Sequence, residues 1–393
     1  MSDSTRPLTD IDPLDQDMRF DDFRRYEQIR QAGGIAWSPA HGGFWAVADF
    51  ELVRMIALDH TRFRSGPGVR VPPNGTPPTF ALEYDRPAHT AHRGILTEAV
   101  GPRTAPTLDG QVRAHARRLL DGAMDGRLDL GECYAFQLSL DVMFELIGAP
   151  VELKEEVVLL AESLFLYRTP MSDGSDPAVR LREILDDLLA TRAAEPTGDW
   201  LSRIVSFRDH PETPLTDEEI RGAVVALLVG GHHSTARATG CLLAQIVSDP
   251  DLQRRLREKP ERLPAAVEET VRLWTPLRWF ARTAVEDVEL GSALVAAGER
   301  VLLLYAGANR DPARFDEPDA FFLDRPRGKG HLAFGWGIHR CVGMPLAQLE
   351  MRAAVEELFA RTSWVDLESD ITWTSSVEPR HIPARLHSVG CAP

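Results

Sequence analysis

The sequence predicts a mainly α-helical chain with small β sheets that folds as a single domain. Two observations support this prediction. From about residue 89 to 275 the apolar residues recur with helical spacing, whereas after residue 282 the chain turns to short runs typical of strands. The length of 393 residues favours two or three domains, but the chain contains no internal repeat or low-complexity tract. We therefore expect an extended polar arm over residues 1–20 and one domain over 21–393.

The N-terminal part is expected to consist of short elements and one long loop. Residues 21–33 are predicted to form a helix that ends at Gly33 and Gly34, and residues 44–47 a strand that follows a glycine turn. Residues 62–88 contain six prolines, which exclude a long helix, so this stretch is predicted to be a loop. Ordered loops of this length often serve as lids or binding loops.

The longest predicted helix opens at Thr216 and runs to about Ser248. Thr216 and Glu219 have the spacing of a capping box, and the acidic first turn suits the positive end of a helix. A helix of this length spans about 50 Å, enough to cross the molecule. Further along, residues 301–305 are predicted to form a strand, and a final helix is expected between Cys341 and about Arg361.

Composition excludes several classes of function. A net charge of −15 argues against a general nucleic-acid surface. No apolar run reaches the ~18 residues of a membrane span, and the polar first residues lack the apolar core of a signal peptide. Four scattered cysteines agree with a reducing compartment. We expect a soluble, cytoplasmic protein that binds neither nucleic acid nor membrane.

The segment F-G-W-G-I-H-R-C-V-G at 334–343 is the most informative part of the chain. Its three glycines let the backbone approach a planar ligand and direct N–H groups at the sulfur of Cys341. A lone cysteine is more often a small buried apolar residue. The spacing instead favours a thiolate-ligated haem, and it resembles the cysteine-ligand loop of the cytochrome P450 family. The resemblance implies that Cys341 ligates the iron of haem b and that Phe334 and Gly343 lie at this cofactor.

The resemblance extends from about Asp12 to Leu386 through four ordered motifs, and it implies the triangular, mostly helical fold of the soluble bacterial members. One motif is Glu269-Thr-Val-Arg272, whose first and last residues share one face of a helix. Such a pair alone is typical of a solvated surface. The resemblance implies that Glu269, Arg272 and Arg325 form a buried network that supports the cysteine loop and haem insertion.

A third motif surrounds His89 and Arg93, which lie four residues apart at the start of a predicted helix and so share a face. Taken alone, this segment would be a basic surface turn. Haem carries two propionates, and carboxylates favour arginine or protonated histidine as partners. The resemblance implies that His89, Arg93, Arg282 and His339 hold these propionates.

The fourth motif is the glycine pair Gly230 and Gly231 inside the long predicted helix, where each glycine costs about 1 kcal/mol relative to alanine. Either the pair lets a cofactor lie against the helix, with Gly231 in contact with it, or it allows close helix packing. The next residues depart from the family pattern, because His233 replaces an acid and Ser234 replaces a threonine, with Thr235 one step beyond.

These three residues are the candidate catalytic side chains. In the family the alcohol orders dioxygen and the acid helps to supply protons. A serine hydroxyl can donate and accept like that of threonine. Histidine can relay protons near neutral pH, but it can also ligate or crowd the iron.

The resemblance implies a monooxygenase that inserts one oxygen atom of dioxygen into a small organic substrate, with electrons from NAD(P)H through a reductase and a ferredoxin. The departure at His233 and Ser234 keeps open an atypical reaction, such as oxidative coupling, peroxide-driven oxidation or dehydration. A non-enzymatic haem sensor is a third interpretation. The expected substrate pocket contains Ala226, Gly230, Leu277, Trp279, Phe280, Arg380 and His381.

A basic docking surface for an acidic ferredoxin is expected on the cysteine side of the molecule. Arg327, Lys329, Arg340 and Arg352 flank the cysteine loop in an otherwise acidic chain. The same pattern is also compatible with a few solvated side chains that have no partner.

Overall fold

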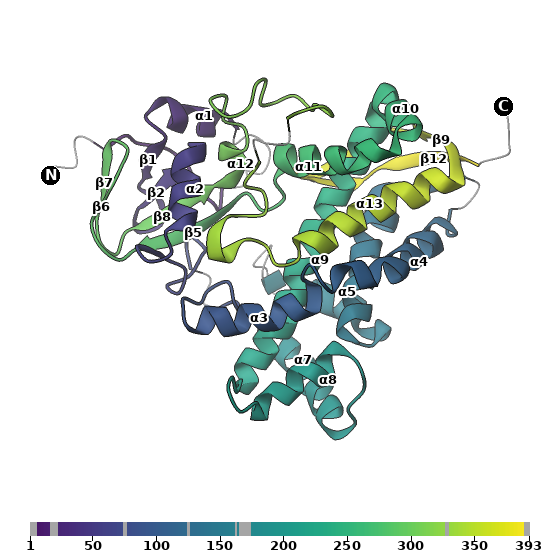
Figure 1. Cartoon of the computed structure of the whole chain (residues 1–393), viewed down its shortest axis with the longest axis horizontal. Coiled ribbons are helices and arrows are strands. Elements are labelled where there is room, and N and C mark those ends of the chain that lie inside the picture. Colours follow the sequence, from purple (N-terminus) through teal and green to yellow (C-terminus); the bar gives the residue numbers. More distant parts are fainter. Residues whose placement is uncertain are drawn as a thin grey trace.

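The protein is triangular, with a β sheet towards one corner and a layered array of helices filling the rest (Figure 1). The computed structural model describes residues 6–15, 23–73, 77–123, 126–161, 163–164, 174–326 and 330–388. It confirms the predicted class, which is mainly α with small β sheets. No helix in the described part of the chain is long and apolar enough to cross a membrane.

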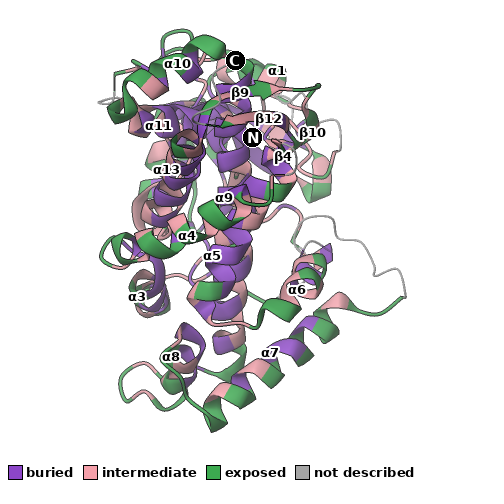
Figure 2. Cartoon of the chain, turned by 90° about the vertical axis from the view of Figure 1, so that its right-hand side faces the viewer, coloured by how far each residue is buried: buried purple, intermediate pink, exposed green. Residues whose placement is uncertain are grey.

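The helical part is organised around α9, which starts at its capping box as predicted. Thr216 Oγ1 accepts a hydrogen bond from the Glu219 N–H at 3.2 Å, and Glu219 Oε2 accepts one from the Thr216 N–H at 2.9 Å. Buried residues run along α9 and its neighbour α5 through the middle of the molecule (Figure 2). The helices are α3 (Ala88–Val100), α4 (Asp109–Leu120), α5 (Gln137–Ile147), α6 (Lys154–Ala161), α7 (Pro177–Ala194), α8 (Trp200–Ser206), α9 (Asp217–Ser248), α10 (Pro250–Glu258), α11 (Leu263–Trp274) and α13 (Met344–Arg361).

The largest sheet has the strand order β1-β2-β8-β5-β3, with α1 (Phe23–Gln31) and α2 (Phe50–Leu58) beside it. Only the β2–β8 pairing in this sheet is parallel. Its strands are β1 (Ile35–Ser38), β2 (Phe44–Val47), β3 (Phe63–Arg64), β5 (Trp279–Ala284) and β8 (Arg300–Leu304). The smaller sheets join β6 (Val288–Leu290) to β7 (Ala293–Val295), β10 (Thr372–Ser375) to β11 (Glu378–His381), and β12 (Pro383–Ser388) to β4 (Arg127–Asp129) and β9 (Thr362–Leu367).

Several predicted boundaries change in the structure. The strand expected at 301–305 ends at Leu304, because Tyr305 opens the short helix α12 (Tyr305–Ala308). Strand β5 begins at Trp279, before the predicted change at residue 282. The strands that follow α13 were not predicted. One of them, β12, pairs with β4, more than 250 residues earlier in the sequence.

The described part of the predicted N-terminal arm lies along β1. Leu8 forms an isolated bridge with Trp37, whose N–H donates to the Pro7 carbonyl at 2.6 Å. Ile11 is fully buried beside the sheet. Residues 1–5 and 16–20 of the predicted arm lie outside the described residues.

Candidate functional site

The cysteine loop immediately precedes α13, and Cys341 is held close to its start. The Cys341 N–H donates to the Phe334 carbonyl at 2.7 Å, and the turns at Gly335 and Gly337 have φ values of 66° and 72°, which favour glycine. Burial raises the pKa of Cys341, although N–H groups of Gly343 and Met344 donate to the sulfur and lower it in part. The residue as a whole is nevertheless exposed to solvent.

Four predicted propionate partners from three elements gather beside this loop. The rings of His89 on α3 and His339 in the cysteine loop lie 4.4 Å apart, and His339 Nε2 is 3.1 Å from Ser65 Oγ. Arg93 Nη2 donates to the Arg340 carbonyl at 2.5 Å. Arg282 on β5 is buried, and its charge acts on His339.

This cluster has unused capacity to bind an anion. Burial and, to a smaller extent, the neighbouring positive charges lower the pKa of His89 to about 4 and that of His339 to about 2. The imidazoles are therefore uncharged at neutral pH, and each can donate one N–H. Both ring nitrogens of His89 are buried without a hydrogen-bond partner among the described residues.

These residues fit the haem that the resemblance implies. Two arginines and two uncharged imidazoles suit a pair of carboxylates. The raised pKa of Cys341 means that its thiolate needs a positive charge close to the sulfur, and a bound metal ion supplies that charge. The N–H groups of Gly343 and Met344 supply the hydrogen bonds expected around a ligating sulfur.

The middle of α9 presents one face with little side-chain bulk. Ala226, Gly230 and Ser234 follow each other at intervals of four residues, so they share this face. Gly230 is exposed, and a Cβ atom added there would meet nothing within 4 Å. Ser234 Oγ donates to the Gly230 carbonyl at 3.0 Å, so its lone pairs remain available on the same face.

The second glycine of the pair serves helix packing, which corrects the predicted cofactor contact of Gly231. A Cβ atom at Gly231 would lie 2.6 Å from the sulfur of Met143 on α5. Ser139, also on α5, donates to the carbonyls of Gly231 and His232 at 3.3 and 3.1 Å. The two adjacent glycines therefore have different functions in the packing of α9.

His232 and His233 both contact Phe136, which belongs to the π-helical turn η5 (Leu130–Phe136). The ring distances are 4.4 Å for His232 and 6.1 Å for His233. Burial and, to a smaller extent, the charges of Arg237 and Arg380 lower the pKa of His233 to about 3. Thr235 is buried on a different face of α9 from Ser234, so the open face carries one of the three predicted catalytic side chains.

Glu269, Arg272 and Arg325 form the buried network expected from the sequence. Arg272 binds both carboxylate oxygens of Glu269 at 2.8 Å, and Arg325 Nε lies 2.9 and 3.0 Å from the same oxygens. Burial opposes ionisation, but these partners and the Phe322 N–H keep the pKa of Glu269 below its usual value. Arg272 also donates to the carbonyls of Asn309, Pro318 and Ala320, which fixes the segment before the cysteine loop.

Several predicted pocket residues do not lie together. Trp279 and Phe280 point to opposite faces of β5 and pack against different core clusters. Leu277 is exposed. Arg380 pairs with Glu132 at 2.5 Å, and His381 with Asp129 at 2.7 Å. The prediction that all of them line one pocket is therefore wrong.

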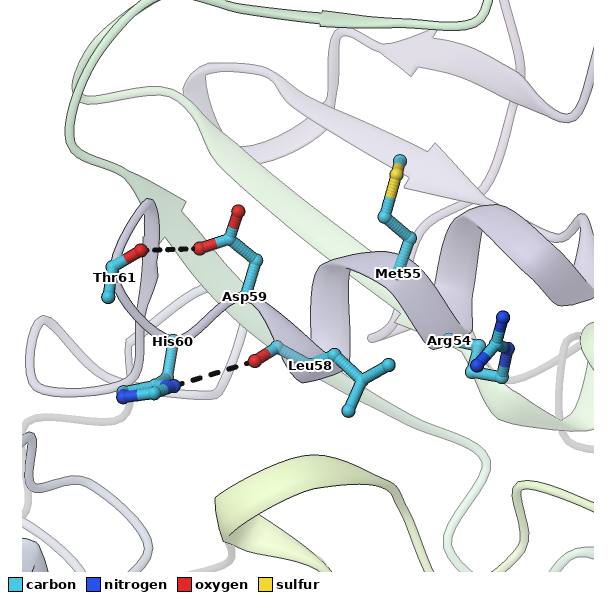
Figure 3. Close-up of a pocket in the computed structure, with 6 residues that line it drawn as sticks. All are labelled: Arg54, Met55, Leu58, Asp59, His60 and Thr61. Carbon is cyan, nitrogen blue, oxygen red and sulfur yellow. Dashed lines mark hydrogen bonds between the residues drawn. The ribbon is translucent and has the colours of Figure 1, made fainter.

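The predicted docking surface is described in part. Arg340 is exposed and stacks on Trp336, and Arg352 is half-buried on α13. Arg327 and Lys329 lie outside the described residues. Next to the cysteine loop, the end of α2 carries a surface depression of about 420 Å³ (Figure 3). This depression is lined by Arg54, Met55, Leu58, Asp59, His60 and Thr61.

One buried titratable residue was missed. Glu350 on α13 lies nine residues after Cys341 and is 1% exposed, and burial raises its pKa well above the usual value. Neither carboxylate oxygen of Glu350 has a hydrogen-bond partner among the described residues. Ser139 on α5 lowers this pKa only in part, and its hydroxyl group donates to the carbonyls of Gly231 and His232. The sequence signal was an acid between Leu349 and Ala353 on an apolar helix face.

Comparisons with known proteins agree with this geometry. The model of the family described as cytochrome P450 matches residues 182–372. The chain is 31% identical to mycinamicin IV hydroxylase/epoxidase of Micromonospora griseorubida, over 94% of this chain and 95% of that protein. Among solved structures, cytochrome P450 CYP109Q5 from Chondromyces apiculatus has a TM-score of 0.83 at 26% identity and covers 98% of this chain and 100% of its own. The putative thioether synthase SgvP, involved in the tailoring step of griseoviridin, has a TM-score of 0.82 at 30% identity and covers 91% and 95%.

Replacing the central carboxylate of the buried network is expected to destabilise the fold. Glu269→Gln leaves two buried guanidinium groups without their charge partner, so the free energy of unfolding should fall by about 3 kcal/mol at pH 7. Because the pKa of Glu269 is lowered in the folded state, its contribution is present above the unfolded pKa and lost as the pH falls through the folded pKa. Urea unfolding followed by circular dichroism measures both effects.

Glu268→Gln is the matched control, because Glu268 pairs with His331 at 3.1 Å with its side chain 43% exposed. It should cost less than about 1 kcal/mol. A loss for Glu269→Gln that is no larger than this control would contradict the structural role of the network.

Proposed function

The chain belongs to the cytochrome P450 family of haem-thiolate monooxygenases, and from this membership we propose that it inserts one oxygen atom of dioxygen into a small organic substrate by hydroxylation or dealkylation. The observation that carries the proposal is the gathering of Cys341 with His89, Arg93, Arg282 and His339 at one place. Haem b, when bound, supplies the activation of dioxygen, which a thiolate ligand favours by donating electron density to the iron.

Each group in this set has a distinct role. Cys341 would bind the iron through its sulfur, and the N–H groups of Gly343 and Met344 would stabilise the negative charge there. Arg93, Arg282 and the two imidazoles would hold the propionates. Glu269 and its arginines have no contact with the reaction, but they fix the chain that leads into the cysteine loop.

Helix α9 provides the groups that would handle dioxygen and protons, Ser234 from its open face and His233 from a buried position beside it. Ser234 orders dioxygen and water through its hydroxyl group, which can donate and accept. His233 is uncharged at neutral pH, so it has one N–H donor and one acceptor and can pass a proton. Ala226 and Gly230 leave room for substrate on the same face.

An oxidative coupling reaction is the second candidate. Two observations favour it: the histidine and serine in place of the family's acid and threonine, and the similarity to the putative thioether synthase SgvP. Oxygen-18 labelling separates the two candidates, since an inserted oxygen atom comes from dioxygen whereas a coupling product gains none.

Electrons are proposed to arrive from NAD(P)H through a reductase and an acidic ferredoxin that docks on the cysteine side. Support comes from Arg340, which is exposed in the cysteine loop, and from Arg352 on α13. The depression at the end of α2 adds two exposed apolar side chains beside this surface, Met55 and Leu58 (Figure 3). A polar rim around an apolar centre is typical of protein interfaces.

Loss of the sulfur ligand is expected to abolish the proposed function. The reduced carbon monoxide complex of Cys341→Ser should lack the thiolate spectrum, and the variant should give no labelled product from oxygen-18 dioxygen with substrates found by haem spin-state shifts. Cys133→Ser, at the other exposed cysteine of the described chain, should keep both signals. A thiolate spectrum in Cys341→Ser would disprove the ligand assignment.

Removal of the Ser234 hydroxyl group is expected to uncouple the reaction. Ser234→Ala should release more hydrogen peroxide and form less product per NADH consumed, because dioxygen loses a positioned donor. The ratio of peroxide to product should rise by about tenfold. Thr239→Ala removes a buried hydroxyl group elsewhere on α9 and should leave the ratio unchanged. Equal coupling in wild type and Ser234→Ala would make Ser234 a spectator.

Charge reversal on the cysteine side is expected to slow electron delivery. The double variant Arg340→Glu and Arg352→Glu should accept electrons from reduced ferredoxin about tenfold more slowly at low salt, because docking loses electrostatic attraction. The difference should shrink as salt screens the charges. Arg182→Glu on α7 is the control. If stopped-flow reduction is unchanged in the double variant, docking occurs elsewhere.

A further inference from the structure

Two arginine–glutamate pairs flank His233 and come from three separate elements. Arg237 on α9 pairs with Glu378 on β11 at 2.8 Å. Arg380 on β11 pairs with Glu132 on η5 at 2.5 Å. Carboxylates are therefore present next to His233, although the helix position itself has lost its acid.

The backbone holds η5 and β11 in a fixed relation, so this arrangement is a built one. Asp129 Oδ1 accepts hydrogen bonds from the N–H groups of Gly131 and Glu132 on η5 and of Ile382 beyond β11, at 2.9, 3.1 and 2.9 Å. A Cβ atom at Gly131 would lie 2.4 Å from the Arg380 carbonyl oxygen, so only glycine permits this approach.

A cavity of about 20 Å³ joins the two pairs to His233. This volume holds about one water molecule, and the polar groups around it can satisfy the hydrogen bonds of that water. The cavity is lined by Gly131, Glu132, Phe136, His233, Ala236, Arg237, Glu378, Pro379 and Arg380.

The side chains around the cavity form a gradient of exposure. Glu132 and Arg380 are each 29% exposed, Arg237 and Glu378 are 17% and 15% exposed, and His233 is 7% exposed. The outer pair meets solvent, the inner pair is mostly covered, and the histidine is buried. The order of these groups defines a route from solvent to α9.

His233 has the protonation state that such a route requires. Burial and the two arginines hold its pKa at about 3, so the neutral ring carries one N–H and one free acceptor nitrogen. The charged or titratable groups that face it are His232 and Arg237 from α9, Glu132 from η5, and Glu378 and Arg380 from β11.

We propose that Glu132 and Glu378 are the proton entrance of this enzyme and take over the function of the acid that α9 lacks at His233. A carboxylate takes a proton from bulk water and passes it, through one water in the cavity, to the acceptor nitrogen of His233. The opposite ring nitrogen releases its own proton toward the face of α9 that carries Ser234. One proton enters from solvent and one leaves the ring, and a ring flip restores the starting tautomer.

This inference rests on the proposed monooxygenase function and adds two positioning residues to it. A purely structural function of the same ion pairs, which clamp β11 to α9, predicts a different pattern of effects. Loss of a clamp impairs every reaction of the enzyme, whereas loss of a proton route impairs only reactions that draw protons from solvent. Hydrogen peroxide brings its own two protons, so peroxide-driven oxidation bypasses the route.

The test compares Glu378→Gln and Glu132→Gln with wild-type holoenzyme. With NADH, a ferredoxin and its reductase, dioxygen consumption should fall by about tenfold in Glu378→Gln and the solvent deuterium isotope effect should rise, because proton delivery limits the rate. Peroxide-driven oxidation of an aromatic probe should stay within about twofold of wild type, since no solvent proton is needed. Glu378→Asp should restore part of the rate.

Glu368→Gln is the matched control, because Glu368 also pairs with two arginines, Arg127 and Arg385, but does not line the cavity. It should leave dioxygen consumption, the solvent isotope effect and the peroxide-driven rate unchanged.

A second readout is independent of turnover: nitrogen-15 NMR of the diamagnetic carbon monoxide complex should show neutral His233 at pH 5. In the double variant Arg237→Gln and Arg380→Gln the pKa of His233 should rise, because the repelling charges are gone and only burial still lowers it.

Unchanged dioxygen consumption and isotope effect in both glutamine variants would overturn the proton entrance while leaving the monooxygenase intact. Equal losses in the dioxygen and peroxide reactions would overturn it in favour of a structural clamp. A wild-type enzyme that consumes no dioxygen would remove the proposed function itself.

Discussion

The contact between the Glu269 carboxylate and two guanidinium groups supports the part of the chain that leads into the cysteine loop. Residues 309–325 contain no regular strand or long helix, so their carbonyl groups need other partners. Arg272 and Arg325 provide these partners, donating to the carbonyls of residues 309, 316, 317, 318 and 320 while both bind Glu269. A buried acid with two bases thus replaces the hydrogen bonds of secondary structure. Such a network costs desolvation, but it fixes one irregular path, and a thiolate loop needs a fixed path because a metal ligand tolerates little displacement.

The second constraint is that α9 must be both a packing element and a wall of the site. Gly230 and Gly231 each meet one of these two requirements. A Cβ atom added at one would point about 100° away, around the helix axis, from a Cβ atom added at the other. The first leaves open space and the second admits Met143 of α5. Ser139 of α5 then donates to the carbonyls of Gly231 and His232. Helices α5 and α9 are therefore joined through one hydroxyl group beside the second glycine.

Local signals were sufficient for much of this structure. The capping box at Thr216 depends on four consecutive residues, and the helix it predicts, residues 217–248, is confirmed. The order of motifs along the chain predicted the family, the buried network and the cluster of His89, Arg93, Arg282 and His339. Side-chain partners that lie far apart in sequence were not predictable: nothing near Arg380 indicates that it pairs with Glu132, 248 residues earlier. The strand that contains Trp279 was placed too late, so its alternation, which sends Trp279 and Phe280 to opposite faces, was also missed.

Because side-chain partners can lie far apart in the sequence, the residue type at a single motif position is a poor guide to chemistry. Read along α9 alone, His233 marks a site that has lost an acid. In the folded chain, three segments more than 90 residues apart bring two carboxylates and two guanidinium groups to that histidine. Burial is the main reason that the ring of His233 stays neutral, and the charges of Arg237 and Arg380 add to this effect. A helix position can therefore carry a neutral histidine in place of an acid and still have carboxylates beside it, provided that neighbouring elements supply those carboxylates.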